Sequence, residues 1–293
     1  MQSVFNAIVD YAGLFPPASL GMDEAVANFA AYRQGEDRWM LGRYVVAGSR
    51  LGELGESIAS QGIVIDPAMP WGLSVVIGVH LPQELGRIDA FAESPASDGL
   101  RVEAIEARVG SPGEAEVVGG ALEGRGERYL EVPHQTAYGD LTRAIAGVGA
   151  YAKIRTGGTT ADAFPSPLQL TRFLMAATRI GLPFKATAGL HHPWRGTYPL
   201  TYAPDSPRHR MYGFVNLLMA TAVLRAGAEG EVAQMILEEN DPAAFRFTPD
   251  GLAWRDEAVG MDDLEATRLE GFRGFGSCSF REPVDELAAG VGR

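Results

Sequence analysis

Short runs of apolar and β-branched residues recur along the chain, and stretches with a helical apolar period follow most of them. The short runs predict eight strands, at residues 5–11, 43–47, 73–79, 102–109, 128–132, 150–156, 183–188 and 274–279. The stretches between them predict helices at residues 23–33, 51–60, 82–91, 114–122, 138–148 and 167–180. Alternation of strand and helix is typical of a parallel sheet with right-handed crossover connections.

Eight predicted strands favour a closed sheet over an open one. We therefore expect an α/β fold, a (β/α)₈ TIM barrel, formed as one domain by residues 1–293. The length agrees, since such barrels typically need ~250 residues. An open, doubly wound sheet is the alternative, but no G-x-G-x-x-G motif follows the first predicted strand.

The regular alternation is interrupted once, at residues 191–271. This segment begins with a loop rich in aromatic residues and proline, continues with two apolar helical patterns and ends with a hairpin pattern around Pro249-Asp250-Gly251. We expect it to be an insertion after the seventh strand, on the C-terminal face of the barrel. Its first part, residues 190–212, is expected to act as a lid over the substrate. Its apolar helices could also form a subunit interface.

The composition narrows the class of protein. Hydrophobic residues make up 46% of the chain and charged residues 21%, which is typical of a globular protein. The formal net charge of −12 argues against binding to nucleic acid or to anionic membranes. No secretory signal and no apolar stretch long enough to span a membrane is evident, so we expect a cytoplasmic protein with a small-molecule substrate, and a homo-oligomer is possible.

Lys153 and Lys185 lie inside predicted strands, where an unpaired ammonium group is costly to bury. Each is followed four residues later by a glycine, Gly157 or Gly189. Because side chains alternate along a strand, Lys153 shares a face with Arg155, and both lysines are expected to point into one cavity. Two cations at that range should lower each other's pKa, and a partly neutral lysine can attack a carbonyl to form a Schiff base.

Other interpretations of these lysines remain open. Lys153 could simply pair with a carboxylate such as Glu131, or it could join Arg155 in binding an anionic substrate. Asp10, at the end of the first predicted strand, could orient a lysine or serve as a base, and could equally cap the turn that follows.

Three predicted strand ends resemble those of class I aldolases of the deoxyribose-phosphate aldolase type. The K-T-S-T-G pattern of that family's sixth strand aligns with residues 153–157 (KIRTG), and K-A-S-G-G-I of the seventh aligns with residues 185–190 (KATAGL). The G-T-S-S or G-A-S-S phosphate loop of the eighth is matched by residues 276–279 (GSCS). The resemblance covers about the last half of the chain. Over its whole length the chain also looks like a bacterial family, a likeness that implies no activity.

The aldolase resemblance implies a role for each motif. Lys153 would form the Schiff base, and Lys185 would perturb its pKa and relay protons. The backbone around Gly276, Ser277 and Ser279 would bind an anionic group of the substrate.

The chain also departs from the aldolase pattern. The family's catalytic aspartate has no clear counterpart, and Glu103 and Glu106 on the fourth predicted strand are the nearest acids. Arg155 replaces a small polar residue, and the insertion at 191–271 is foreign to compact members.

His191 and His192, directly after the seventh strand motif, suggest a different chemistry. Imidazoles at a barrel mouth can bind a divalent metal, and together with Asp10 they define a metal-dependent lyase or hydrolase as the alternative function. Adjacent residues of an extended segment point opposite ways, so usually only one of the two could ligate a given ion. We therefore predict substrate contact or acid–base work for them, with loop hydrogen bonding as the alternative, and no metal or other cofactor. Cys278 is expected to be an inert buried thiol because it lies in an apolar strand; as the alternative, a nucleophilic thiol would need a histidine partner and a pKa-lowering environment.

The expectation is thus a carbon–carbon lyase or aldolase that acts on a carbonyl substrate bearing a carboxylate or phosphate. Lys153 and Lys185 would act with assistance from Glu106, Glu131 or a histidine. A non-catalytic ligand-binding barrel is the second alternative.

Overall fold

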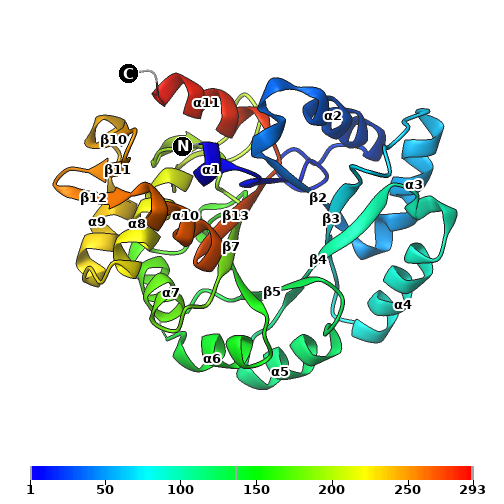
Figure 1. Cartoon of the computed structure of the whole chain (residues 1–293), viewed down its shortest axis with the longest axis horizontal. Coiled ribbons are helices and arrows are strands. Elements are labelled where there is room, and N and C mark those ends of the chain that lie inside the picture. Colours follow the sequence, from blue (N-terminus) through cyan, green and yellow to red (C-terminus); the bar gives the residue numbers. More distant parts are fainter. Residues whose placement is uncertain (1, 136, 292–293) are drawn as a thin grey trace.

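A computed structural model describes residues 2–135 and 137–291, and in it eight parallel strands close into a barrel surrounded by helices (Figure 1). The strand order is β1-β13-β7-β6-β5-β4-β3-β2, with β2 returning to β1. The strands are β1 Val9–Tyr11, β2 Leu41–Ala47, β3 Trp71–Val76, β4 Leu100–Arg108, β5 Glu127–Val132, β6 Tyr151–Arg155, β7 Phe184–Thr187 and β13 Phe272–Ser277. The predicted TIM barrel is therefore confirmed.

Amphipathic helices cover the outside of this barrel. Those predicted from periodicity are α2 Met22–Gln34, α3 Leu51–Ser60, α4 Leu81–Ala92, α5 Pro112–Ala121, α6 Gly139–Gly147 and α7 Pro167–Arg179. The start of helix α7 is well defined, because Ser166 and Gln169 form a reciprocal capping box and Pro167 occupies the first turn. The C-terminal helix α11 (Arg281–Val291) completes the ring next to α2 (Figure 1).

Several ends of the predicted strands differ from the structure; the third predicted strand, for example, runs to residue 79, whereas β3 ends at Val76. The first predicted strand begins too early, because residues Gln2–Phe5 form the short helix α1 and only Val9–Tyr11 pair as a strand. The eighth predicted strand runs too far, because the chain turns after Ser277. There the Ser279 hydroxyl accepts a hydrogen bond from the Glu282 backbone N–H, at 3.2 Å, as the chain enters α11.

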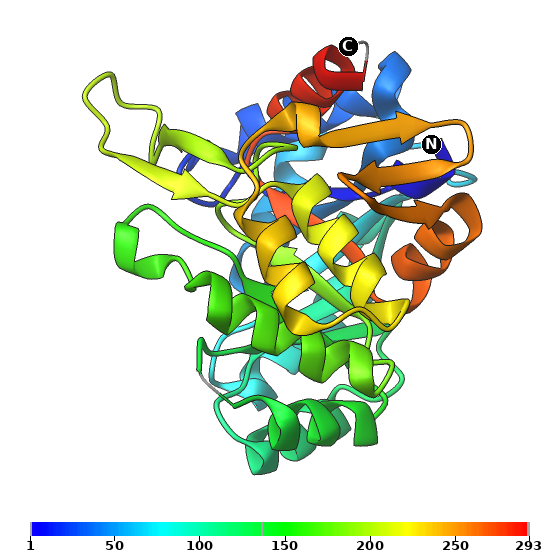
Figure 2. The same cartoon turned by 90° about the vertical axis from the view of Figure 1, so that its left-hand side faces the viewer.

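Residues 191–271 do not form one lobe on the C-terminal face. Only the hairpin of β8 (Gly196–Pro199) and β9 (Arg208–Met211) projects beyond that end of the barrel (Figure 2). Helices α8 (Phe214–Arg225) and α9 (Gly230–Glu238) pack beside α7 in the outer ring. Helix α8 is buried almost all round, which explains why its sequence is apolar on every side.

The rest of the segment lies towards the N-terminal end of the barrel. The predicted hairpin consists of β10 (Phe245–Thr248) and β11 (Gly251–Trp254), and β12 (Glu257–Gly260) extends it to a three-stranded antiparallel sheet. Helix α10 (Met261–Glu270) leads from this sheet into β13 and packs against α1. None of the helices in the described ranges 2–135 and 137–291 has the length and apolar character needed to cross a membrane.

Candidate active site at the C-terminal end of the barrel

Five charged side chains meet in the barrel interior, and we call Asp10, Glu106, Glu131, Lys153 and Lys185 the charged centre. Lys153 Nζ lies 2.6 Å from Glu106 Oε2 and 2.8 Å from Glu131 Oε2. Lys185 Nζ lies 2.7 Å from Glu106 Oε1 and 2.5 Å from Asp10 Oδ2. All five residues are buried. Glu106 therefore bridges the two lysines, one carboxylate oxygen to each.

Strand register explains why these residues meet. Lys153 on β6 pairs in register with Lys185 on β7, and Glu131 on β5 pairs with Lys153. Side chains at equivalent positions of neighbouring strands point to the same face, which here is the barrel interior. Asp10 on β1 and Glu106 on β4 are not on strands adjacent to the lysines they contact, so closure of the barrel brings them in.

In the charged centre, the pKa of Glu106 and that of Lys185 are each set by neighbours of opposite charge, and not by neighbours of the same charge. Burial disfavours the charged form of Glu106, but Lys153 and Lys185 outweigh it and hold the pKa of Glu106 well below its usual range. Burial likewise disfavours the Lys185 ammonium, yet Asp10 and Glu106 raise the pKa of Lys185 above its usual value. The expected mutual lowering of lysine pKa values is therefore wrong for Lys185, because Glu106 lies between the two ammonium groups.

A cavity of about 500 Å³ opens above the charged centre, at the C-terminal ends of the strands. Its volume lies in the range of small-molecule binding sites. Both lysines line it, as do Glu106 and Glu131. The other polar groups on its wall are Arg108, Arg155, Thr159, Thr187, His191 and Cys278.

Two arginines reach this cavity from strand ends. Arg108 Nε donates to Glu131 Oε1 at 3.1 Å, and Arg155 Nη1 lies 3.8 Å from the same oxygen. The side chain of Arg108 is 77% exposed and that of Arg155 is 37% exposed, so both can turn towards a ligand. Arg155 was predicted to contact an anion, and the structure places it at the mouth beside Lys153.

The predicted glycines have two different roles. Gly189 adopts a positive φ of +68°, and a Cβ there would lie 2.8 Å from the Cα of Gly157. A Cβ on Gly157 would clash with the ring of Phe164, at 2.4 Å. These two glycines therefore allow the ends of β6 and β7 to approach each other. Gly276 and Gly189 line the cavity, whereas Gly157 packs beside it.

His191 lies in a cluster of polar groups on the cavity wall. Its Nδ1 atom is 3.1 Å from Ser277 Oγ, 3.8 Å from Cys278 Sγ and 3.5 Å from Glu282 Oε2. Burial disfavours the imidazolium, but Cys278 and Glu282 raise the pKa of His191 to about 10. Burial raises the pKa of the Cys278 thiol, but the His191 imidazole and the Tyr202 hydroxyl outweigh it, so the net shift is downward. Cys278 thus has the histidine partner that its expected inertness assumed to be missing.

The remaining predicted residues point elsewhere. His192 Nδ1 donates to the Glu286 carboxylate at 2.9 Å, and its ring stacks on Tyr198, away from the charged centre. The hydroxyls of Ser277 and Ser279 are occupied by His191 and by the start of α11, respectively. In the part of the chain that the structure describes, no group of three or more His, Cys, Asp or Glu side chains is arranged to hold a metal ion.

Sequence reasoning missed one informative signal. Lys153 and Lys185 are the only lysines among 293 residues, against 23 arginines, and both are in the charged centre. It also missed Ser74 on β3, whose hydroxyl donates to Glu106 Oε1 at 2.5 Å. Counting each basic residue type separately would have given a further reason to single out both lysines.

The chain was also compared with known proteins. No family model and no curated protein matches it.

Proposed function

We propose that the chain is a carbon–carbon lyase of the aldolase type, in which Lys153 forms a Schiff base with a carbonyl substrate. The observation that carries the proposal is the placement of both lysines side by side under a cavity of small-molecule size, with Glu106 between them. We further propose a cytoplasmic enzyme, where the thiol of Cys278 would remain reduced.

The use of lysine at these two positions supports amine chemistry. All the other long basic side chains of the sequence are arginines, and arginine is always protonated and cannot act as a nucleophile. An ion pair alone would not need lysine, since arginine makes stronger bidentate pairs with carboxylates. Lysine can lose its proton and attack a carbonyl.

The carboxylates around Lys153 provide the proton acceptor for that attack. When a carbonyl group enters the cavity, Glu131 at 2.8 Å can accept a proton from the ammonium. The neutral amine adds to the carbonyl carbon, the carbonyl oxygen becomes a hydroxyl, and loss of water leaves the iminium. Glu131 returns its proton to the oxygen that leaves as water, and it then accepts the proton of the substrate hydroxyl beyond the bond to be broken. The electron pair of that carbon–carbon bond moves into the iminium, which gives an enamine, and the other fragment leaves as a carbonyl compound. Glu106, held ionised by both lysines, stabilises the cationic intermediate.

Lys185 is assigned a supporting role. Its raised pKa keeps it protonated, so it provides a fixed positive charge and holds Glu106 between the two strands. Lys153 is preferred as the nucleophile because it lies nearer the two arginines of the mouth and shares Glu131 with them.

The substrate class follows from the charges of the mouth. Arg108 and Arg155 can turn from Glu131 to an anionic group, and the protonated His191 adds a third cation. We therefore propose a carbonyl compound with a carboxylate or phosphate, its carbonyl carbon over Lys153 and its anionic group at the rim.

Reductive trapping tests this proposal directly. Incubation with pyruvate, glyoxylate or acetaldehyde followed by borohydride should leave a mass adduct on the peptide that contains Lys153. Lys153→Arg keeps the charge and should abolish the adduct, whereas Lys185→Arg is the matched control and should retain it. An adduct found only on Lys185, or none with any carbonyl compound, would show that Lys153 is not a Schiff-base lysine.

A further inference from the structure

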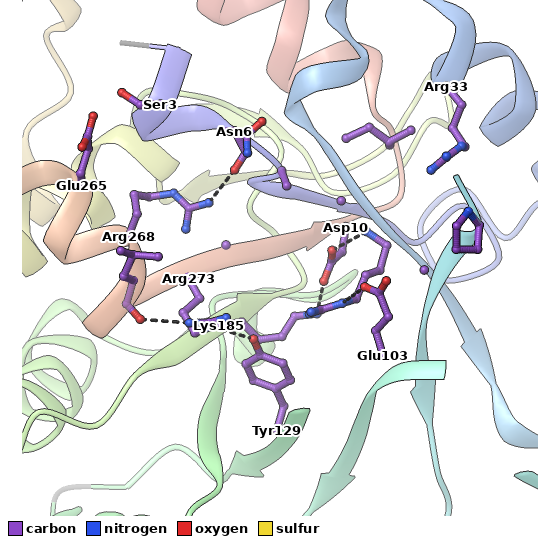
Figure 3. A pocket seen from close by; sticks show the side chains of 18 residues that line it. Ser3, Asn6, Asp10, Arg33, Glu103, Tyr129, Lys185, Glu265, Arg268 and Arg273 are labelled. Carbon is purple, nitrogen blue, oxygen red and sulfur yellow. Dashed lines mark hydrogen bonds and ion pairs between the residues drawn. The ribbon is translucent and has the colours of Figure 1, made fainter. Parts of the chain in front are cut away.

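The barrel has a second cavity, of about 510 Å³, at the opposite end (Figure 3). It lies among the N-terminal ends of the strands, and helices α1 and α10 contribute to its wall. The charged residues that line it are Asp10, Arg33, Arg43, Glu103, Lys185, Glu265, Arg268 and Arg273. Five cations thus face three carboxylates, in a protein whose net charge is −12.

Arg268 is the unusual member of this lining. Its guanidinium is buried and donates to three backbone carbonyls, those of Val4 at 2.7 Å, Phe272 at 2.9 Å and Asn6 at 3.1 Å. A guanidinium has five N–H groups, so one N–H on each terminal nitrogen has no acceptor among residues 2–135 and 137–291. Burial and the nearby Arg273 lower the pKa of Arg268 to about 10.

No described carboxylate forms an ion pair with Arg268, and the same holds for Arg33 at the edge of the cavity. Arg33 donates to the backbone carbonyl of Met69 at 2.9 Å, and burial lowers its pKa. By contrast, Arg43 and Arg273 are neutralised by Glu103 and Glu127. Two guanidinium charges on the wall of one cavity are therefore without a counter-ion. Buried charges are normally paired, since desolvation without a partner is costly.

We infer that this cavity is a binding site for a small organic anion that bears a carboxylate or phosphate group, which Arg268 holds. The free N–H groups of Arg268 supply charge-assisted hydrogen bonds of the kind that guanidinium forms with both groups. The site is separate from the proposed catalytic mouth, and Arg268 takes no part in the proposed reaction. Glu265, which has no cationic partner among the described residues, weakens the binding by repulsion.

A substitution next to Arg268 offers a test that preserves the fold. Figure 3 shows Asn6 next to Arg268, whose guanidinium donates to the backbone carbonyl of Asn6. Asn6→Asp nearly conserves shape and adds a carboxylate to the wall of the cavity, one side chain away from this contact. Asn240→Asp adds the same charge at an exposed position outside the cavity and is the matched control.

The measurement is calorimetric titration with sodium citrate and, separately, with sodium phosphate, together with thermal unfolding against sodium chloride of equal ionic strength. At least one anion should bind and should raise the Tm of the wild-type protein above the chloride reference. A response to citrate alone identifies a carboxylate ligand, and one to phosphate alone identifies a phosphate ligand. Asn6→Asp should increase the Kd by about tenfold or more, whereas Glu265→Gln should decrease it.

Asn240→Asp should bind the anion as the wild type does, and Arg155→Gln, which changes only the C-terminal mouth, should keep the binding at the second cavity. The inference is overturned if neither anion binds or stabilises beyond chloride, or if Asn6→Asp retains the wild-type Kd. It is also overturned if Arg155→Gln alone loses binding, because the anion then belongs to the C-terminal mouth.

Discussion

Glu106 holds the charged centre together, because each of its two carboxylate oxygens faces a different lysine. Ser74 supports one of these oxygens through its hydroxyl. A buried carboxylate between two ammonium groups compensates both charges, so its loss leaves each lysine with one remaining partner, Glu131 or Asp10. Removing one member of a buried ion-pair network is usually far more costly than losing a surface pair.

We expect Glu106→Gln to lower the free energy of unfolding by about 3–5 kcal/mol, measured by urea denaturation at pH 7. The exposed Glu116→Gln is the control and should change it by less than about 0.5 kcal/mol. Equal stabilities of the two variants would mean that the bridge is energetically neutral.

Cys278 gives a second prediction for a single residue. The neighbouring imidazolium of His191 favours the thiolate, so iodoacetamide should alkylate Cys278 at a pH below that needed for an ordinary thiol. His191→Gln removes that charge and should slow the reaction at pH 7 by about tenfold, which corresponds to a rise of one pKa unit. Peptide mass spectrometry over time measures the rate. His192→Gln, on the neighbouring residue that faces Glu286, should leave it unchanged.

Among the secondary-structure elements, the ends of β6 and β7 are the most closely packed part of the site. Gly157 follows β6, Gly189 follows β7, and their backbones approach to a distance that excludes any Cβ on Gly189. This contact sets how far the mouth loops can close over Lys153 and Lys185. Both glycines stood out in the sequence because each follows a lysine by four residues, and we predicted that they bind the substrate or its anionic group; the structure shows a packing role for them.

Gly189→Ala should therefore destabilise the fold through two effects, the strained positive φ and the clash with Gly157. Gly62→Ala is matched to it, since Gly62 has a similar φ of +63° but open space around it. The control should cost about 1–2 kcal/mol and Gly189→Ala at least about 1 kcal/mol more. Thermal and urea unfolding of the two variants provide the comparison, and equal losses would rule out the close approach.

The period of apolar residues along the sequence located most helices and strands, because this pattern depends only on residues close together in the chain. Helix α3 was predicted with its observed bounds, Leu51–Ser60, from a clear apolar stripe. Strand β1 was overextended because the apolar residues of α1 lie directly before it, and a short buried helix has no period distinct from a strand. Strand β12 was missed because Glu257–Gly260 holds a single β-branched residue and pairs only through β11.

The charged centre was predictable only in part for a related reason. Register between neighbouring strands is a local property, and it correctly placed Lys153 beside Lys185. The contacts of Glu106 and Asp10 with these lysines cross the barrel, so they depend on how the whole sheet closes and tilts. We predicted lowered lysine pKa values because the sequence alone does not show that Glu106 and Asp10 lie beside the lysines. For Lys185 these carboxylates raise the pKa.

For the whole molecule, the charged interior predicts how stability depends on pH. The folded-state pKa of Glu106 is depressed, so its contribution is complete above the ordinary value of 4.5 and is lost as pH falls. The folded-state pKa of Lys185 is raised, so its contribution is complete below the ordinary value of 10.5 and is lost as pH rises. The free energy of unfolding should therefore be highest between these two values.

Urea denaturation across pH measures this dependence. Glu106→Gln should flatten the acid limb of the curve more than the alkaline limb, because it removes the carboxylate that titrates there while Asp10 still holds Lys185. Identical acid limbs in the wild type and the variant would show that other carboxylates control acid unfolding.

Lys185 lines both cavities, so its ammonium group forms part of the partition between the two ends of the barrel. A ligand at either end meets the same positive charge, shared through Asp10 on one side and Glu106 on the other. Were binding at one end to change the affinity at the other, thermodynamic reciprocity would require an equal factor in both directions. Because the two cavities share this one ammonium group, the two ends of the barrel are electrostatically connected through it.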